Sequence, residues 1–434
     1  MERTLLVVVA VLACLTALGV WLLWPSPQPA AQQDLPPQFK GVVHSASTYD
    51  CPPDSDDFGP ARTGPCQRAV VEVLSGPDTG TTFELDTAEG DYPAFHAGDR
   101  VLLGVQDDTE GRTNYYVGDF DRRLPLALLA AVFVAVVLLV GRGHGLRALI
   151  GLGASLLIVT RFIVPAVIAG ENPFAVAVVG AFAVMILTLY LCHGLNVKTT
   201  AALVGTAAAL GVTALLGVTF VTLTRLTGFS SEEASFVRFA IEGVDLRGLV
   251  LAGLVIGALG VLDDVTVAQA STAFAVHDAN PQQSRGEVFR RAMSVGRDHI
   301  ASTVNTLVFA YVGASIVLLV LFTSGGSAFG EIINSEVVAQ EVVMILVGSL
   351  GLISAVPFTT ALAATLAARQ RKIPSSAPTY VPVHLRDDVD EEQLSEEERD
   401  HRRWVRFLRE GQQDSDEPTP SDPGDQQPQR YVNR

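Results

Sequence analysis

Two adjacent carboxylates, Asp263 and Asp264, lie inside a hydrophobic segment that runs from about Gly248 to Phe274. A segment of this length can cross a bilayer as one helix. A charged group at that depth costs about 3 kcal/mol or more, so it usually faces protein or water and marks a path for ions, protons or substrate. Two touching carboxylates do not both ionise readily, and one of them therefore keeps a proton more easily. The pair predicts a proton-relay site.

Helical spacing indicates which way the pair points. At 100° per residue, Gly253, Gly257, Gly260, Asp264 and Ser271 share one stripe of the segment. Small residues four positions apart let another helix approach closely. We therefore expect the glycines to pack against a helix, Asp264 to point into that seam, and Asp263 to lie at its flank. The alternative is a buried polar pair that only fixes helix register.

Three further polar side chains could act with the aspartates. Asn305 and Thr306 share one face of the next apolar segment and are expected to hydrogen-bond a carboxylate or relay a proton. They lie nearer the cytoplasm than the pair by roughly one turn, about 5 Å. Arg161 is the other charge within an apolar block and could be a counter-ion. Its competing explanation is extension of the side chain to the lipid headgroups, because it lies nearer the outer face.

The elements that position these residues are long apolar blocks separated by short polar joints. Hydrophobic residues make up 49% of the 434-residue chain, and their arrangement in blocks indicates an α-helical polytopic membrane protein rather than a large soluble core. The predicted spans cover about residues 5–24, 124–140, 146–168, 174–191, 201–223, 248–274, 300–322 and 342–367.

The basic residues orient these eight spans. Arg and Lys gather after the second, fourth, sixth and eighth spans, at Arg142, Arg147, Lys198, Arg285, Arg290, Arg291, Arg297, Arg369, Arg371 and Lys372. Cytoplasmic loops carry such an excess, so both termini are expected in the cytoplasm. The net charge of −16 argues against a nucleic-acid partner.

Four regions are predicted along the chain. Residues 1–24 form the first transmembrane anchor, because the apolar run is longer than that of a signal peptide; cleavage near Ala30 is the alternative. Residues 25–123 hold a linker and a small β-rich extracytoplasmic domain, an OB-like barrel or sandwich of five or six strands. Residues 124–368 form a seven-helix bundle. Residues 369–434 form an acidic, largely disordered cytoplasmic tail.

Two of the four cysteines lie in the outer segment, and the other two lie in or at predicted spans. Cys51 and Cys66 are the only pair in the outer segment, where a disulfide persists, and they flank a turn-rich loop. Cys14 and Cys192 lie in or at spans and are expected to behave as small apolar residues. The histidines of the outer segment have no metal-ligand spacing. We expect no metal and no cofactor.

Two stretches of the chain carry a resemblance to a known family. They are Leu251-Ala-Gly-Leu-Val-Ile-Gly-Ala-Leu-Gly-Val-Leu-Asp-Asp-Val-Thr-Val267 and Arg297-Asp-His-Ile-Ala-Ser-Thr-Val-Asn-Thr-Leu307. With the layout of one span, an outer domain and many spans, they resemble the YibE/F family of bacterial membrane proteins. The resemblance reaches to about Ala367 and leaves out the tail. It implies a multi-pass protein of the bacterial cell membrane.

A more distant likeness concerns mechanism. The Asp-Asp-x-x-Val motif, a polar inner loop and Ser-x-x-x-Thr in the next span are similar to SecD/SecF and other RND-type proton-driven proteins. Here the acidic span is the sixth instead of the fourth, and the outer domain is small. The likeness implies that Asp263 and Asp264 are the protonatable pair and that Thr306 or Asn305 is a relay.

Two functions are consistent with these patterns. The first is a proton-coupled transporter or export-assisting protein that exchanges protons or ions and acts on an unknown substrate. The second is a non-transporting membrane scaffold or sensor whose outer domain binds a partner. An enzyme is not expected, because the chain has no zincin, nucleophile-elbow or phosphate-loop motif. Adjacent acids also do not fit an intramembrane aspartyl protease, which needs its acids on separate spans.

Overall fold

The computed structural model describes residues 2–25, 38–50, 65–88, 94–107, 113–241, 243–326 and 328–369, with Arg399 and Arg403 of the tail. The predicted Pro-rich linker and nearly all of the predicted disordered tail lie outside the described residues. The same holds for Cys51, so the Cys51–Cys66 disulfide stays a prediction. Cys66 itself is buried near the start of a strand.

The outer segment folds into a small β domain, as predicted. Its strands are β1 (Phe39–Asp50), β2 (Pro65–Val73), β3 (Thr82–Ala88), β4 (Arg100–Asp107) and β5 (Thr113–Phe120). All neighbouring strands pair antiparallel, in the order β3-β2-β1-β4-β5. A bulge between Val43 and Ser45 interrupts the register of β1 with β2, which bends the strand and increases its twist.

The β domain curls around its own apolar core. Side chains on one face of the strands are buried together with Phe95: Val43, Ala69, Val71, Val73, Val101, Leu103 and Val117. The two edge strands also approach each other, because the rings of Phe83 on β3 and Tyr115 on β5 stack with their centroids 6.0 Å apart. The five strands pair in an open order, and the domain is therefore a half-barrel.

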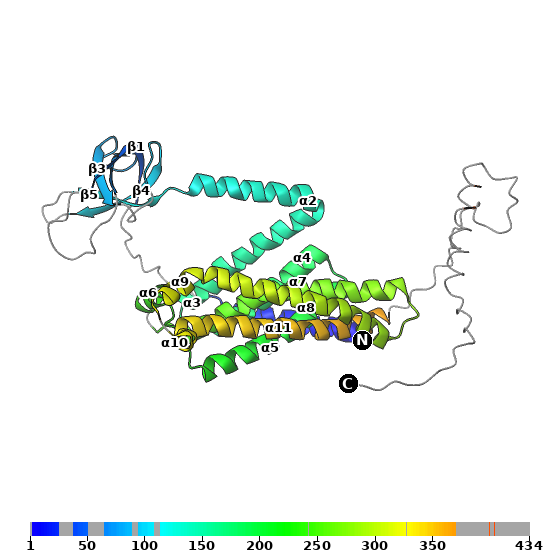
Figure 1. The fold of residues 1–434 in the computed structure, drawn as a ribbon. Helices are drawn as coiled ribbons and strands as arrows, with labels where there is room; N and C mark the ends of the chain where they lie inside the picture. Colours follow the sequence, from blue (N-terminus) through cyan, green and yellow to red (C-terminus); the bar gives the residue numbers. More distant parts are fainter. Residues whose placement is uncertain are drawn as a thin grey trace, which may run out of the picture. The chain divides into compact units, whose positions relative to one another are not determined.

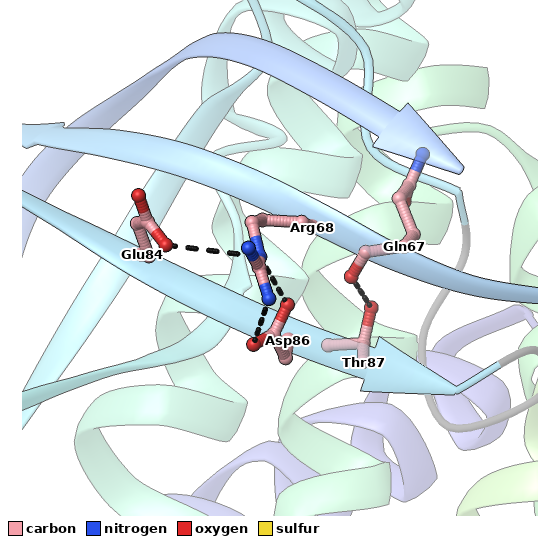
Figure 2. Close-up of polar contacts among 5 residues, drawn as sticks. All are labelled: Gln67, Arg68, Glu84, Asp86 and Thr87. Atoms are coloured by element: carbon pink, nitrogen blue, oxygen red, sulfur yellow. Dashed lines mark hydrogen bonds and ion pairs between the residues drawn. The ribbon is translucent and has the colours of Figure 1, made fainter. Parts of the chain in front are cut away.

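Polar pairs hold the opposite, solvent-facing side of the sheet (Figure 2). Arg68 on β2 donates from Nε to Asp86 Oδ1 on β3 at 2.9 Å and lies 3.7 Å from Glu84 Oε2. The hydrogen bond from Arg68 lowers the pKa of Asp86 below its ordinary value. These side chains are exposed, so they contribute little stability and chiefly favour the register of β2 with β3.

The rest of the described chain is helical (Figure 1). The helices are α1 (Glu2–Leu22), α2 (Arg123–Ile158), the π-helix η1 (Val159–Ile163), α3 (Val164–Ile168), α4 (Pro173–His193), α5 (Val197–Leu223), α6 (Glu232–Ala240), α7 (Leu246–Ala279), α8 (Arg285–Ala314), α9 (Ile316–Ser324), α10 (Phe329–Asn334) and α11 (Glu336–Ala367). Helix α7 is central and packs against α4, α5, α8 and α11.

Several of these helices are suited to a membrane. Six helices in the described part of the chain are long and apolar enough to cross a bilayer, and the number is seven if α8 and α9 count as one span. Those two helices are bent by 61° at Ser315. The predicted class, a mostly helical protein with long apolar helices and a separate β domain, is confirmed.

The run of helix from Arg123 to Ile168 is broken inside α2. Arg142 has φ 48° and ψ −129°, values that do not belong to a helix. A positive φ is uncommon for any residue other than glycine. Glycines at 141 and 143 flank the break, and Gly145 lies so close to the Val137 carbonyl that a side chain there would overlap it. The break falls in the polar joint that separates the predicted spans 124–140 and 146–168.

Helices α5 and α11 meet through two reciprocal contacts. Gly205 on α5 faces Thr359 on α11, and Gly351 on α11 faces Thr213 on α5. A methyl group added to either glycine would overlap the hydroxyl of the facing threonine. Both threonines are fully buried. The absence of a glycine side chain therefore lets the two backbones approach closely, as in other small-residue helix interfaces.

Hydrogen bonds between buried polar side chains join the same helices to α7 and α8. Gln269 on α7 donates from Nε2 to the Ala292 carbonyl oxygen on α8 at 3.0 Å and to Thr360 Oγ1 on α11 at 2.7 Å. The hydroxyls of Thr206 on α5 and Thr266 on α7 are 2.6 Å apart. These bonds satisfy polar groups that would be costly to bury alone, and they fix the positions of four helices.

Candidate functional site

Helix α7 places Asp263 at the middle of its length. The helix begins at an Asp245 N-cap, whose side chain accepts a hydrogen bond from the Gly248 amide at 2.9 Å. Large apolar residues such as Leu254, Val255 and Leu262 are buried against the neighbouring helices and set the rotation of α7. This rotation turns Asp263 toward α4. The carboxylate is half-buried, and its Oδ1 atom is buried without a hydrogen-bond partner among the described residues.

Asp263 lies on the wall of a cavity of about 270 Å³. Helices α2, α4 and α7 and the π-helix η1 supply its lining residues: Ser155, Val159, Ile163, Ala181, Val184, Thr188, Ile256, Leu259, Gly260 and Asp263. Its hydroxyls donate to the backbone of their own helices, Ser155 to Gly151 O at 2.9 Å and Thr188 to Val184 O at 2.8 Å. Their oxygens remain able to accept a hydrogen bond.

The π-helix η1 shapes one wall of this cavity. Its wider turn is closed by the Val164 amide, which bonds to the Val159 carbonyl oxygen five residues earlier. Pro165 follows directly and has no amide hydrogen to continue an α-helical pattern. Ile163 packs against Gly180 of α4 in the space that a side chain would fill. Single π turns within α-helices are frequent at functional sites.

The expected counter-ion is not in place. Arg161 lies within η1, but its side chain is exposed. Within the described ranges it forms no ion pair with Asp263 or Asp264. The reason is the direction of the turn, which buries the neighbouring Phe162 and Ile163 and leaves Arg161 outside. Of the two alternatives for Arg161, the exposed side chain agrees with extension to the lipid headgroups and not with an ion pair to the aspartates.

The prediction for Asp264 also needs correction. Gly253, Gly257, Gly260 and Asp264 do share one face of α7, but that face is exposed, and Asp263 has the more buried position. Leucine and valine side chains make more van der Waals contacts with neighbouring helices than glycines do, so the aliphatic face of α7 turned inward. The glycine face approaches α8 only loosely, with Tyr311 Oη 3.5 Å from where a Cβ on Gly257 would be.

The predicted relay residues on α8 are not assembled with the aspartates. Asn305 and Thr306 are both exposed, and Thr306 donates to the Ser302 carbonyl oxygen at 3.0 Å. Neither forms a hydrogen bond with the pair in the part of the chain that the structure describes. Helix α8 packs instead through a face that begins with Val288, Ala292 and Gly296. That face contains the small residues that admit close neighbours.

Sequence reasoning missed the hydroxyls that do lie with Asp263. Ser155 and Thr188 come from different helices and are isolated polar residues within apolar blocks. That isolation is the signal that could have found them. The Cys192 thiol, one turn beyond Thr188, lies close enough to Asp263 to interact with it electrostatically. In the described residues, no group of three or more His, Cys, Asp or Glu side chains could hold a metal ion.

Comparison with known proteins identifies the helical part of the chain. A family model described as YibE/F-like protein matches residues 129–369, more than half of the sequence. The match includes every residue that lines the Asp263 cavity and excludes the β domain. No curated protein and no solved structure matches the chain.

Proposed function

The chain belongs to the YibE/F-like protein family, and we propose that this membrane protein is a proton-coupled transporter or export-assisting protein in which Asp263 carries the proton. The observation that supports the proposal most is the buried, unpartnered Oδ1 of Asp263 at the wall of a cavity in the middle of a long apolar helix. An ionisable group at membrane depth that faces a cavity is typical of proton and ion paths.

The chemistry of the cavity is consistent with reversible protonation. A charged Asp263 would have no ion-pair partner among the described residues, and an unpaired charge is costly in an apolar setting. A protonated carboxyl group can instead donate to a hydroxyl oxygen of Ser155 or Thr188, both of which line the cavity. Asp264 is adjacent but exposed, and its charge opposes a second charge on Asp263. Asp263 can therefore release and regain a proton as its access to water changes.

The proposal includes a topology of eight crossings of the bacterial plasma membrane. The helical run from Arg123 to Ile168 has 46 residues and would be about 69 Å long if straight, roughly twice the bilayer core. We therefore divide it at Arg142 into two spans. An even number of spans places both termini on the same side of the membrane, and the basic residues after the even-numbered spans make that side the cytoplasm. Reporter fusions placed after Arg142, Lys198, Arg297 and Lys372 should all report the cytoplasm, and a single fusion reporting the outside contradicts this topology.

The test compares the two neighbouring aspartates. Purified protein is reconstituted into vesicles that contain a pH-sensitive dye, and proton flux is followed after a pH jump. Asp263→Asn should reduce flux at least tenfold, because an amide hydrogen-bonds but cannot carry a proton. Asp264→Asn is the matched control and should keep most of the flux. Both variants are checked for insertion and for an unchanged melting temperature.

Each other result decides against part of the proposal. A folded Asp263→Asn variant with wild-type flux rules out Asp263 as the carrier. Loss of flux only in Asp264→Asn moves the carrier to the exposed face. If the wild-type protein shows no flux under any gradient, the non-transporting scaffold or sensor becomes the better explanation, and the β domain becomes the surface to test for partners.

A further inference from the structure

A second cavity lies between α4, α5 and α7. Its volume is about 200 Å³, which is room for several water molecules at roughly 30 Å³ each. Most of the side chains that line it are polar or charged, namely His193, Asn196, Lys198, Thr199 and Ser271. The apolar residues of the lining are Ala202 and Val267. His193, Asn196 and Lys198 are exposed, so the cavity opens to solvent at the end of α4 where α5 begins.

This second cavity is aligned with Asp263 along α7. Asp263, Val267 and Ser271 follow one another at intervals of four residues, so each lies one turn further along the helix and about 40° around it from the one before. Val267 belongs to the wall of the second cavity and is one turn, about 6 Å, from Asp263. Helix α4 shows the same order, since Thr188 lines the first cavity and His193 lines the second.

We propose that the second cavity is the aqueous entrance through which protons reach Asp263 from the side that carries Lys198, and that Val267 is the apolar barrier between them. This inference rests on the proposed function and adds the route that the proton takes to Asp263. Polar walls hold water, and ordered water conducts protons. The barrier is short, because a single helical turn separates the wall of the entrance from the carboxylate.

The lining also favours protons over metal cations. Sodium and other hard cations need several oxygen ligands in place of their hydration shell. The second cavity has the Lys198 ammonium group and the His193 ring at its mouth, and the described residues that line it include no carboxylate. A dehydrated metal cation therefore finds no set of carboxylate ligands among the described lining residues, whereas a proton crosses along water and exchangeable side chains without a fixed oxygen cage.

The first test asks whether water fills the entrance and does not depend on transport. Ser271→Cys is made in full-length protein that carries Cys14→Ala and Cys192→Ala. Ala268→Cys is the matched control, because it lies on the same helix, on a face that the other helices leave uncovered and that meets lipid in a bilayer, and does not line either cavity. A membrane-impermeant, negatively charged methanethiosulfonate reagent is added to inside-out or right-side-out vesicles. The Ser271→Cys thiol should react from the Lys198 side only, at least tenfold faster than the control thiol.

The second test asks whether Val267 is the barrier. Val267→Ala should raise passive proton leak through the reconstituted protein severalfold, whereas Val261→Ala, a partly buried valine of α7 outside both cavities, should not. A Val267→Ala leak equal to wild type overturns the barrier. A Ser271→Cys thiol that is unreactive, or that reacts from the opposite side, overturns the entrance.

The outcomes separate this inference from the proposed function. Ser271→Cys labelling from the expected side with no effect of Asp263→Asn on flux leaves an aqueous cavity that does not serve Asp263, and it refutes both the carrier and the route. Loss of flux in Asp263→Asn without labelling of Ser271→Cys keeps Asp263 as the carrier and overturns only the entrance.

Discussion

The close contact of α5 with α11 makes a sharp prediction for Gly205→Ala. The new methyl carbon would overlap Thr359 Oγ1 and lie 2.9 Å from Thr359 Cβ and 3.2 Å from Thr359 Cα. Since Thr359 is fully buried and its backbone is part of the contact, a rotamer change cannot remove the clash. The two helices must separate instead. Overpacking of this kind costs about 1–3 kcal/mol of unfolding free energy.

A control on the same helix isolates this packing cost. Gly211 is exposed, and nothing lies within 4 Å of a Cβ built on it. Replacing either glycine by alanine gains about 1 kcal/mol of helix propensity. The gain cancels when the two variants are compared, so Gly205→Ala should be less stable than Gly211→Ala by about 1–3 kcal/mol. For a domain of this size the difference is roughly 2–12 °C in melting temperature.

The assay is thermal unfolding of the full-length variants in one detergent, followed by circular dichroism and by loss of the monodisperse peak. Gly351→Ala should behave like Gly205→Ala, because it meets Thr213 in the same way. Equal melting of Gly205→Ala and Gly211→Ala would refute the argument that the glycine side of this contact holds the backbones together.

Three other predictions concern different parts of the chain. Gln269→Leu removes two buried hydrogen bonds and should lower stability by about 1–3 kcal/mol in the same assay; an unchanged melting temperature contradicts it. Alkylation without reductant, followed by intact-mass measurement, should find Cys51 and Cys66 both blocked, and two free thiols contradict the disulfide. Arg68 lowers the pKa of Asp86 from 3.8, so this pair stabilises the β domain above that pH and the stabilisation is lost as the pH falls. Arg68→Met should reduce the pH dependence of β-domain unfolding below about pH 5, and an unchanged profile would exclude a role for the pair.

The class of each region could be predicted from the sequence because it depends on local patterns. Long apolar blocks identified the helices, and short β-branched runs with turn residues identified the β domain. The strand order could not be predicted, because β1 and β4 pair across more than fifty residues of chain. The bend at Ser315 was also missed, since the apolar run from Ile300 to Phe322 continues through it without a proline.

The sequence located the candidate site along the chain, but it did not predict which of the two aspartate side chains faces the cavity. The acidic motif drew attention to the middle of α7, where Asp263 lines the cavity. Neighbouring residues on a helix point about 100° apart, so the small rotation that chose between Asp263 and Asp264 decided which of them meets the cavity. That rotation depends on how Leu254, Val255 and Leu262 pack against other helices. Such packing is a tertiary property, and helical spacing within α7 alone could not reveal it.

The paired contacts of α5 with α11 have a mechanical consequence. On each helix the glycine and the threonine are eight residues apart, which is about 12 Å along the axis. Two anchor points at that separation prevent both sliding and swivelling, because either motion would drive a threonine into a backbone. Helices α5 and α11 are therefore expected to move together as one rigid unit. Buried hydrogen bonds also tie α7 and α8 to this pair, so we expect any motion within the bundle to involve α2 and α4, and these are the helices on which a probe of motion belongs.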